Sequence, residues 1–98
     1  MKDMNKQDII NILDKSLNMP IGDVSDEWKA PSVVVGESDG VPFVQTRAES
    51  KDKVKELRDQ VKNALSEKYV IVQGFTQFNS VDFRFWQNLK IIKEKPQK

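Results

Sequence analysis

The segment Ser32–Lys68 reads SVVVGESDGVPFVQTRAESKDKVKELRDQVKNALSEK, and it has the pattern of two strands followed by a helix. Ser38-Asp39-Gly40 separates two β-rich runs, and glycine there tolerates the positive φ of a tight turn. This predicts a β-hairpin over residues 32–48. Residues 50–68 then place apolar side chains at the spacing of one helix face, with Ser50 as the N-cap. These side chains are Val54, Leu57, Val61, Ala64 and Leu65.

A second hairpin is predicted over residues 69–93, with a tight turn at Asn79-Ser80 between its two strands. Gly74, inside the first of these strands, indicates a bulge or a close backbone approach. The last strand alternates, and one of its faces is expected to be core: Val81, Phe83, Phe85, Leu89 and Ile91. The opposite face carries Asp82, Arg84, Trp86, Asn88, Lys90 and Ile92. Residues 94–98 are predicted to be a frayed polar tail.

The N-terminal part is predicted to be a helix over residues 5–18 that begins at an Asn5 cap. An irregular acidic loop, 19–31, follows and contains Trp28. The Trp28 ring is expected either to fold back onto the core or to protrude as an anchor for a partner. The chain is therefore predicted to be a single α+β domain over residues 1–98, with element order α-β-β-α-β-β. Its four-stranded sheet, antiparallel or mixed, would carry both helices on one face and leave the other face open to contacts.

Composition excludes several classes of chemistry. The chain has 98 residues, a formal net charge of +1, no cysteine and no histidine. Thiolate nucleophiles, disulfides and zinc–thiolate sites are therefore impossible, and the commonest general base is missing. Four scattered glycines do not build a phosphate-binding loop. We expect a protein that is not an enzyme and that has no cofactor, no metal site and no catalytic residue.

Hydropathy and charge bear on the location and the partners of the chain. No apolar run approaches membrane-spanning length, and the N-terminus MKDMNKQD is too polar for a signal peptide, so we expect a soluble, intracellular, non-membrane protein. Residues 23–39 contain five acids and one lysine, whereas residues 84–98 contain five bases and one acid. Copies of such a chain can pair head to tail. The alternatives are that both patches are solvated or that they pair within one molecule.

Nucleic-acid binding is a further alternative. Phe75, Phe78 and the aromatic residues after position 82 are interleaved with Arg84 and Lys90, and aromatic and basic side chains on a sheet can stack single-stranded bases. The alternation of the last strand instead favours a core position for Phe83 and Phe85. We therefore expect no specific nucleic-acid partner.

The stretch Val41–Leu65 resembles small tail-completion proteins of long-tailed phages, the tail-terminator and minor capsid proteins. The matching parts are Pro31-Ser32-Val33-Val34-Val35, Val44-Gln45-Thr46-Arg47-Ala48, Asn63-Ala64-Leu65 and FRFWQNLKII over residues 83–92. The resemblance implies a structural protein that forms a ring, typically of six subunits, on the end of the tail tube. Such a ring stops tube polymerisation and joins the tube to the head connector, first in the host cytoplasm and then in the virion.

On this interpretation the interface residues are Trp28, Arg47, Arg84, Trp86, Lys90 and Ile92. The simpler alternative for each is an ordinary core or solvated position. The alternative function is a small phage-encoded binding module that inhibits a host protein, and a less favoured one is binding of single-stranded nucleic acid.

Overall fold

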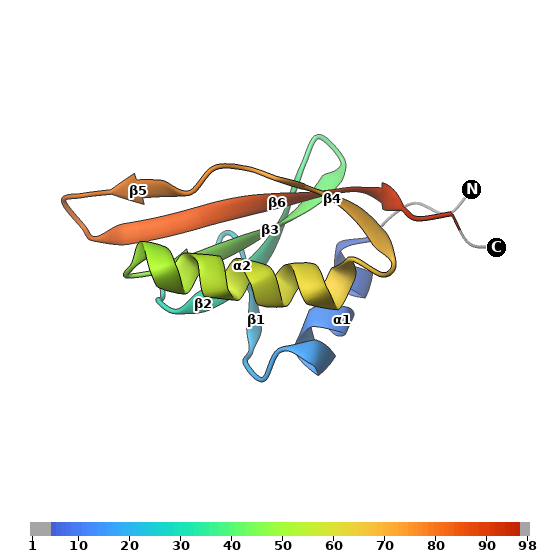
Figure 1. Cartoon of the computed structure of the whole chain (residues 1–98), viewed down its shortest axis with the longest axis horizontal. Helices are drawn as coiled ribbons and strands as arrows, with labels where there is room; N and C mark the ends of the chain where they lie inside the picture. The colour runs from blue at the N-terminus through green and yellow to red at the C-terminus, as the bar shows by residue number, and fades with distance from the viewer. Residues whose placement is uncertain (1–4, 97–98) are drawn as a thin grey trace.

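The computed structural model describes residues 5–96, which form two helices and a six-stranded mixed sheet (Figure 1). The elements in chain order are α1 (Lys6–Ser16), β1 (Ile21–Asp23), β2 (Ser32–Ser38), β3 (Val41–Ala48), α2 (Lys51–Leu65), β4 (Tyr69–Gln73), β5 (Gln77–Asn79) and β6 (Arg84–Glu94). The α+β class is confirmed, with both helices on one face of the sheet. The predicted four strands and the order α-β-β-α-β-β are wrong, because the short strands β1 and β5 are added.

Strand β1 forms inside the segment that was predicted to be an irregular loop. It runs parallel to β2, with Ile21 opposite Val33. The pairing continues just beyond β1, where the N–H of Val24 donates to the carbonyl of Val35 at 3.0 Å. A salt bridge of 2.8 Å from Lys6 on α1 to Asp23 fixes the end of the strand. Three residues are too few to show an alternating pattern in sequence, which explains why β1 was not predicted.

Strand β6 organises the sheet, whose order is β1-β2-β3-β6-β4. It is 11 residues long and pairs antiparallel with β3 along one edge. Its other edge pairs with β5 near the start of β6 and with β4 near the end. A single continuous strand therefore connects the two ends of a molecule whose longest dimension is 47 Å.

The hairpin of β2 and β3 is confirmed. Asp39 and Gly40 both have positive φ, 52° and 78°, and Ser38 pairs with Val41 across them. Two central residues in the left-handed region are characteristic of a type I′ turn, whose twist matches that of the flanking strands. The turn thereby holds β2 and β3 in register over their length.

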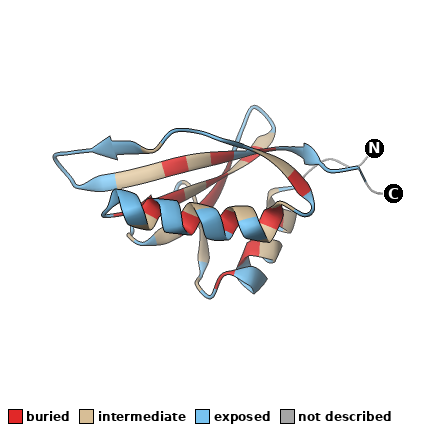
Figure 2. Cartoon of the chain, viewed as in Figure 1, coloured by how far each residue is buried: buried red, intermediate tan, exposed pale blue. Residues whose placement is uncertain are grey.

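Both helices begin at the predicted caps and end earlier than predicted. The Asn5 side chain accepts from the N–H of Gln7, and the Ser50 side chain accepts from the N–H of Lys53. Helix α1 ends at Ser16 rather than at residue 18, and α2 ends at Leu65 rather than at residue 68. The apolar stripes of the helices pack on the inner face of the sheet, as the buried bands in Figure 2 show. The core includes Ile9, Leu13, Val33, Val35, Val44, Val54, Leu57, Val61, Leu65, Leu89 and Ile91.

Gly74 divides the predicted strand 69–78 into β4 and β5. Its N–H donates to the carbonyl of Asn88 at 2.9 Å, and a Cβ at this position would lie only 3.3 Å from that oxygen. The close backbone approach predicted for Gly74 is therefore confirmed. Gln87 is 1% exposed, and its side chain donates through Nε2 to the Gly74 carbonyl at 2.5 Å. This hydrogen bond fixes the interruption between β4 and β5. Sequence reasoning had assigned Gln87 to neither face of the last strand.

The C-terminal segment is more ordered than the predicted tail over residues 94–98. Strand β6 includes Glu94, and the N–H of Lys95 donates to the Lys68 carbonyl at 2.8 Å. The backbone hydrogen bond explains why the strand continues beyond residue 93. The rest of that prediction extends to residues 97 and 98, which lie outside the described residues.

Candidate functional site

The sheet face opposite the helices, here called the outer face, carries all six predicted interface residues. Arg47 lies on β3, and Trp28 folds onto this face from the β1–β2 loop. The other four alternate along β6: Arg84, Trp86, Lys90 and Ile92. The structure brings Trp28, Arg47, Arg84 and Trp86 together in one group, here called the Trp–Arg cluster. It places the remaining two towards the other end of β6.

Trp28 is the centre of the Trp–Arg cluster. Its ring meets that of Trp86 edge to face, with centroids 6.0 Å apart and an interplanar angle of 79°. The guanidinium carbons of Arg47 and Arg84 each lie 5.2 Å from the Trp28 centroid, within cation–π range. Trp28 is half-buried, so it does fold back onto the protein. It covers the outer face of the sheet, however, and does not join the core beneath the helices.

Arg47 attaches the Trp28 loop to the sheet. Only 6% of the residue is exposed, and its Nε donates to Gln45 Oε1 at 2.7 Å. Its two terminal nitrogens donate to the carbonyls of Val24 at 2.9 Å and Asp26 at 3.4 Å. Burial lowers the pKa of Arg47, Asp26 opposes that shift and Arg84 adds to it. The guanidinium nevertheless stays charged, because its ordinary pKa is above 12. Three of its five N–H donors are therefore used within the molecule, and two of these hold the loop on the sheet.

Arg84 differs from Arg47 in its exposure, although neither arginine forms a salt bridge within residues 5–96. Arg84 is exposed, and among residues 5–96 no carboxylate oxygen lies within 4.0 Å of its guanidinium. Contact with the Trp28 ring restrains the guanidinium plane, while the N–H donors at its edge stay available. Arg84 is thus a positioned cation that can bind a carboxylate of a partner.

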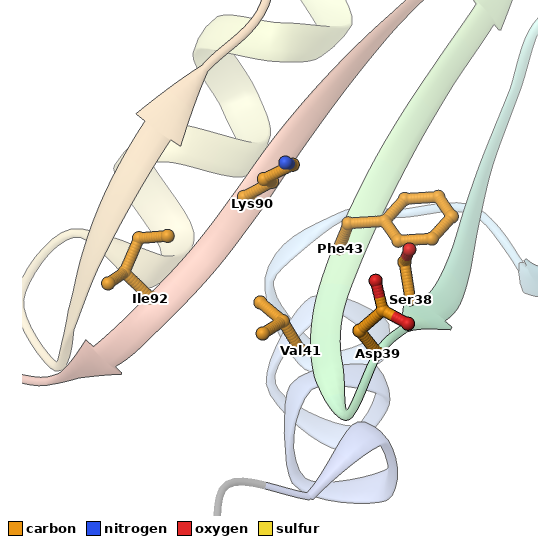
Figure 3. Close-up of a pocket in the computed structure, with 6 residues that line it drawn as sticks. All are labelled: Ser38, Asp39, Val41, Phe43, Lys90 and Ile92. Atoms are coloured by element: carbon orange, nitrogen blue, oxygen red, sulfur yellow. The ribbon is translucent and has the colours of Figure 1, made fainter.

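Lys90 and Ile92 line a second feature, here called the outer groove (Figure 3). Its walls are Ser38, Asp39, Val41, Phe43, Lys90 and Ile92. The groove lies where β3 and β6 diverge, since their pairing stops at Phe43 and Lys90 while β6 continues. Its volume is about 210 Å³. That is smaller than the pockets that hold drug-sized ligands and suits a few side chains.

Most of the exposed large apolar side chains among the described residues lie in residues 75–84, here called the arm. The arm comprises the two residues before β5, β5 itself, the following turn and the first residue of β6. In Figure 1 it extends past the N-terminal end of α2, at the left of the view. Four of its large apolar side chains are mostly exposed: Phe75 at 91%, Phe78 at 64%, Val81 at 84% and Phe83 at 69%. Clustered exposure of this kind is typical of a protein–protein contact.

The arm corrects the predicted core positions of Val81 and Phe83 and the predicted turn at Asn79-Ser80. The Asn79 side chain accepts from the N–H groups of Val81 at 3.0 Å and Asp82 at 3.3 Å. These bonds widen the turn to residues 80–83, so that β6 begins at Arg84. Phe83 consequently takes a φ of 55°. Asparagine side chains often cap a turn in this way, and this was the signal in the sequence.

A cleft of about 340 Å³ lies beneath the arm, on the side that faces α2. Phe78 and Phe85, which pair across β5 and β6, both line it, and their rings stack with centroids 6.0 Å apart and an interplanar angle of 25°. Lys51, at the start of α2, contributes a cation to the rim. The cleft is therefore an aromatic surface with one charged group beside it.

No protein-family model, curated protein or solved structure matches this chain. Within residues 5–96, no three side chains of the metal-binding types gather into a group. No helix in the same range has the length and apolar character needed to cross a membrane.

Proposed function

We propose that this chain is a non-enzymatic structural protein that acts by self-association. The specific role is the one that the tail-terminator resemblance implies: a ring that caps a phage tail tube and joins it to the head connector. The observation that carries the proposal is the arm, which holds four mostly exposed large apolar side chains. Water strongly disfavours such a surface, and burial against another protein removes that cost.

The layout of the molecule supports this role over catalysis. The arm lies at the start of β6, and the outer groove lies near the end of the same strand. Two different surfaces at opposite ends of one rigid strand are what a head-to-tail interface requires, and such interfaces close into rings when the rotation between copies permits. The Trp–Arg cluster contributes a rigid support and one cation, Arg84, which is also the last residue of the arm.

Single-stranded nucleic acid is the second candidate partner. Phe83 is exposed, so the core assignment that argued against base stacking does not hold for this residue. Aromatic side chains on an arm can stack bases. The arm itself, however, carries one acid, Asp82, and one base, Arg84. It therefore lacks the positive field that draws a backbone of phosphates, and a protein partner fits its charge better.

Native mass spectrometry of the full chain over a concentration series tests the proposal, with negative-stain images of the same samples. We expect oligomers well above 11.3 kDa that close into rings. The variant Phe78→Ser/Phe83→Ser should abolish them, whereas Lys55→Ser on the exposed face of α2 should not. A monomer at every concentration that also fails to bind purified tail-tube ends would contradict the proposal. Binding of an oligonucleotide that weakens steeply with salt would instead favour the second candidate.

A further inference from the structure

The arm and the outer groove are held apart within one molecule. Arg84, in the arm, and Ile92, in the groove, both lie on β6, eight residues apart. A strand rises about 3.3 Å per residue, which places these two positions roughly 26 Å apart. The continuous pairing of β6 with β3 and β4 keeps the strand extended. An arm therefore cannot fold into the groove of its own chain, and any contact between the two surfaces joins different molecules.

The two surfaces are complementary in polarity. The tip of the arm presents an acid, Asp82, between two exposed apolar residues, Val81 and Phe83. In the groove, the base Lys90 lies beside the apolar side chains of Val41 and Ile92. Each surface thus offers an apolar contact together with a charge, and these two charges are opposite in sign.

The second charge on each surface is complementary in the same way. The arm also carries Arg84, and the rim of the groove also carries Asp39. Among residues 5–96, none of these four charged side chains has an oppositely charged group within 4.0 Å: Asp39, Asp82, Arg84 and Lys90. Asp82 and Lys90 are thus opposite in charge, and so are Arg84 and Asp39.

We infer that the outer groove is the docking site for the arm of a second copy of this chain, with Asp82 of one copy against Lys90 of the next. This inference rests on the proposed function, because it names the contact by which the copies associate. The groove, at about 210 Å³, accommodates only the tip of the arm. Stable interfaces bury about 800 Å² per partner, so a single docking contact is weak and closure of a ring strengthens it.

Charge reversal tests the contact directly. Asp82→Lys gives a copy with a lysine at both position 82 and position 90, and Lys90→Asp gives a copy with an aspartate at both positions. Each variant alone should repel itself and associate at least about tenfold more weakly at low salt, because juxtaposed like charges are costly. An equimolar mixture should regain association, since residue 82 of either variant and residue 90 of the other have opposite charges. The matched control is the variant pair Asp14→Lys and Lys55→Asp, on exposed helix positions, which should associate like wild type.

A second measurement uses the absence of cysteine in the chain. Val81→Cys and Ile92→Cys should form a disulfide-linked dimer when they are mixed under oxidising conditions, and each alone should form far less.

Wild-type self-association combined with undiminished association of both charge variants would overturn the docking site and leave the proposed function intact. Loss in both variants without recovery in the mixture would overturn the Asp82–Lys90 pairing. A wild type that stays monomeric and also fails to bind tube ends would overturn both proposals. Arm variants that lose only tube binding would show that the arm does not dock into the outer groove of a second copy.

Discussion

Trp28 and Trp86 meet edge to face on the outer sheet face, with ring centroids 6.0 Å apart, although they come from distant parts of the chain. Trp86 belongs to β6, the strand that spans the sheet, whereas Trp28 belongs to the loop between β1 and β2. The contact therefore connects a loop without regular structure to the most extensively paired strand. Arg47 on β3 also attaches this loop to the sheet, because it donates hydrogen bonds to the carbonyls of Val24 and Asp26.

Replacing Trp28 should loosen this loop. Trp28→Ala removes the aromatic contact and two cation–π contacts, and we expect the free energy of unfolding to fall by about 2 kcal/mol. Urea denaturation followed by circular dichroism measures the change. Glu27→Ala, at the exposed neighbouring position, should change the free energy by less than about 0.5 kcal/mol. Equal effects of the two substitutions would show that the cluster contributes nothing to stability.

Arg47 should be more sensitive than an ordinary surface arginine. Arg47→Met leaves the carbonyls of Val24 and Asp26 without their charged donor, and we expect a loss of about 2 kcal/mol in the free energy of unfolding. Amide exchange of residues 24–28 should become faster at the same time. Arg58→Met is the matched control, because Arg58 forms an exposed pair with Asp59 and such pairs contribute less than about 1 kcal/mol. The prediction fails if the two arginine variants are equally stable.

The parts of the fold that were predictable from sequence are those that local chemistry determines. The Asp39-Gly40 turn and the apolar stripe of α2 are encoded within a few neighbouring residues, and both were predicted correctly. Strand β1 depends on pairing with β2, which no local pattern of three residues can reveal. Val81 and Phe83 were assigned to the core because alternation was extended through a turn that Asn79 widens.

The candidate site was predictable as a set of residues but not as an arrangement. Trp86 and Ile92 were selected because they are apolar on a polar face, and Arg84 and Lys90 because they are basic on the same strand. Their separation into a cluster and a groove follows from where the Trp28 loop lies and where β3 leaves β6. Both features are tertiary, so strand periodicity contains no information about them.

Gln87 should determine whether the arm keeps its direction. Gln87→Leu preserves the volume but removes the donor to the Gly74 carbonyl, and we expect a loss of about 1 kcal/mol in the free energy of unfolding. Amide exchange should quicken in residues 77–79 and stay unchanged in β2. Gln60→Leu, at an exposed position on α2, serves as the control for adding leucine. Unchanged amide exchange in β5 would show that the hydrogen bond from the Gly74 N–H to the Asn88 carbonyl is enough to fix the interruption between β4 and β5.

The Lys6–Asp23 salt bridge predicts a specific pH dependence. The hydrogen bond from Lys6, followed by those from Ser25, lowers the pKa of Asp23 well below its usual value of 3.8. The hydrogen bond that Lys6 donates to Asp23 also raises the pKa of Lys6 above its usual value of 10.5. A lowered carboxyl pKa contributes stability that is present above the unfolded pKa and is lost as pH falls through the folded pKa. A raised amine pKa contributes stability below the unfolded pKa, which is lost as pH rises through the folded one.

The contribution of the bridge should therefore be constant between about pH 5 and pH 9 and should decline outside that range. Urea midpoints of wild type and Asp23→Asn, measured from pH 2 to pH 11, give the difference directly. Because the pair is exposed, 1 M salt should reduce the difference at neutral pH. A difference that stays constant down to pH 2 would show that the carboxylate charge of Asp23 has no role.

Phe83 provides the sharpest separation between folding and function. Its φ of 55° lies in the left-handed region, which costs about 1–2 kcal/mol for a residue with a bulky side chain, and most of its ring is exposed. Asparagine tolerates this conformation, so Phe83→Asn should leave the free energy of unfolding unchanged or raise it by up to about 1 kcal/mol. The same change removes an apolar contact from the arm and should weaken self-association at least about tenfold. Urea denaturation and sedimentation at matched concentrations measure the two effects separately. If the Phe83 aromatic ring serves mainly to stabilise the monomer, Phe83→Asn would instead lower the free energy of unfolding and leave self-association unchanged. The combination of a strained backbone and an exposed aromatic side chain is what the proposed contact between copies predicts for Phe83.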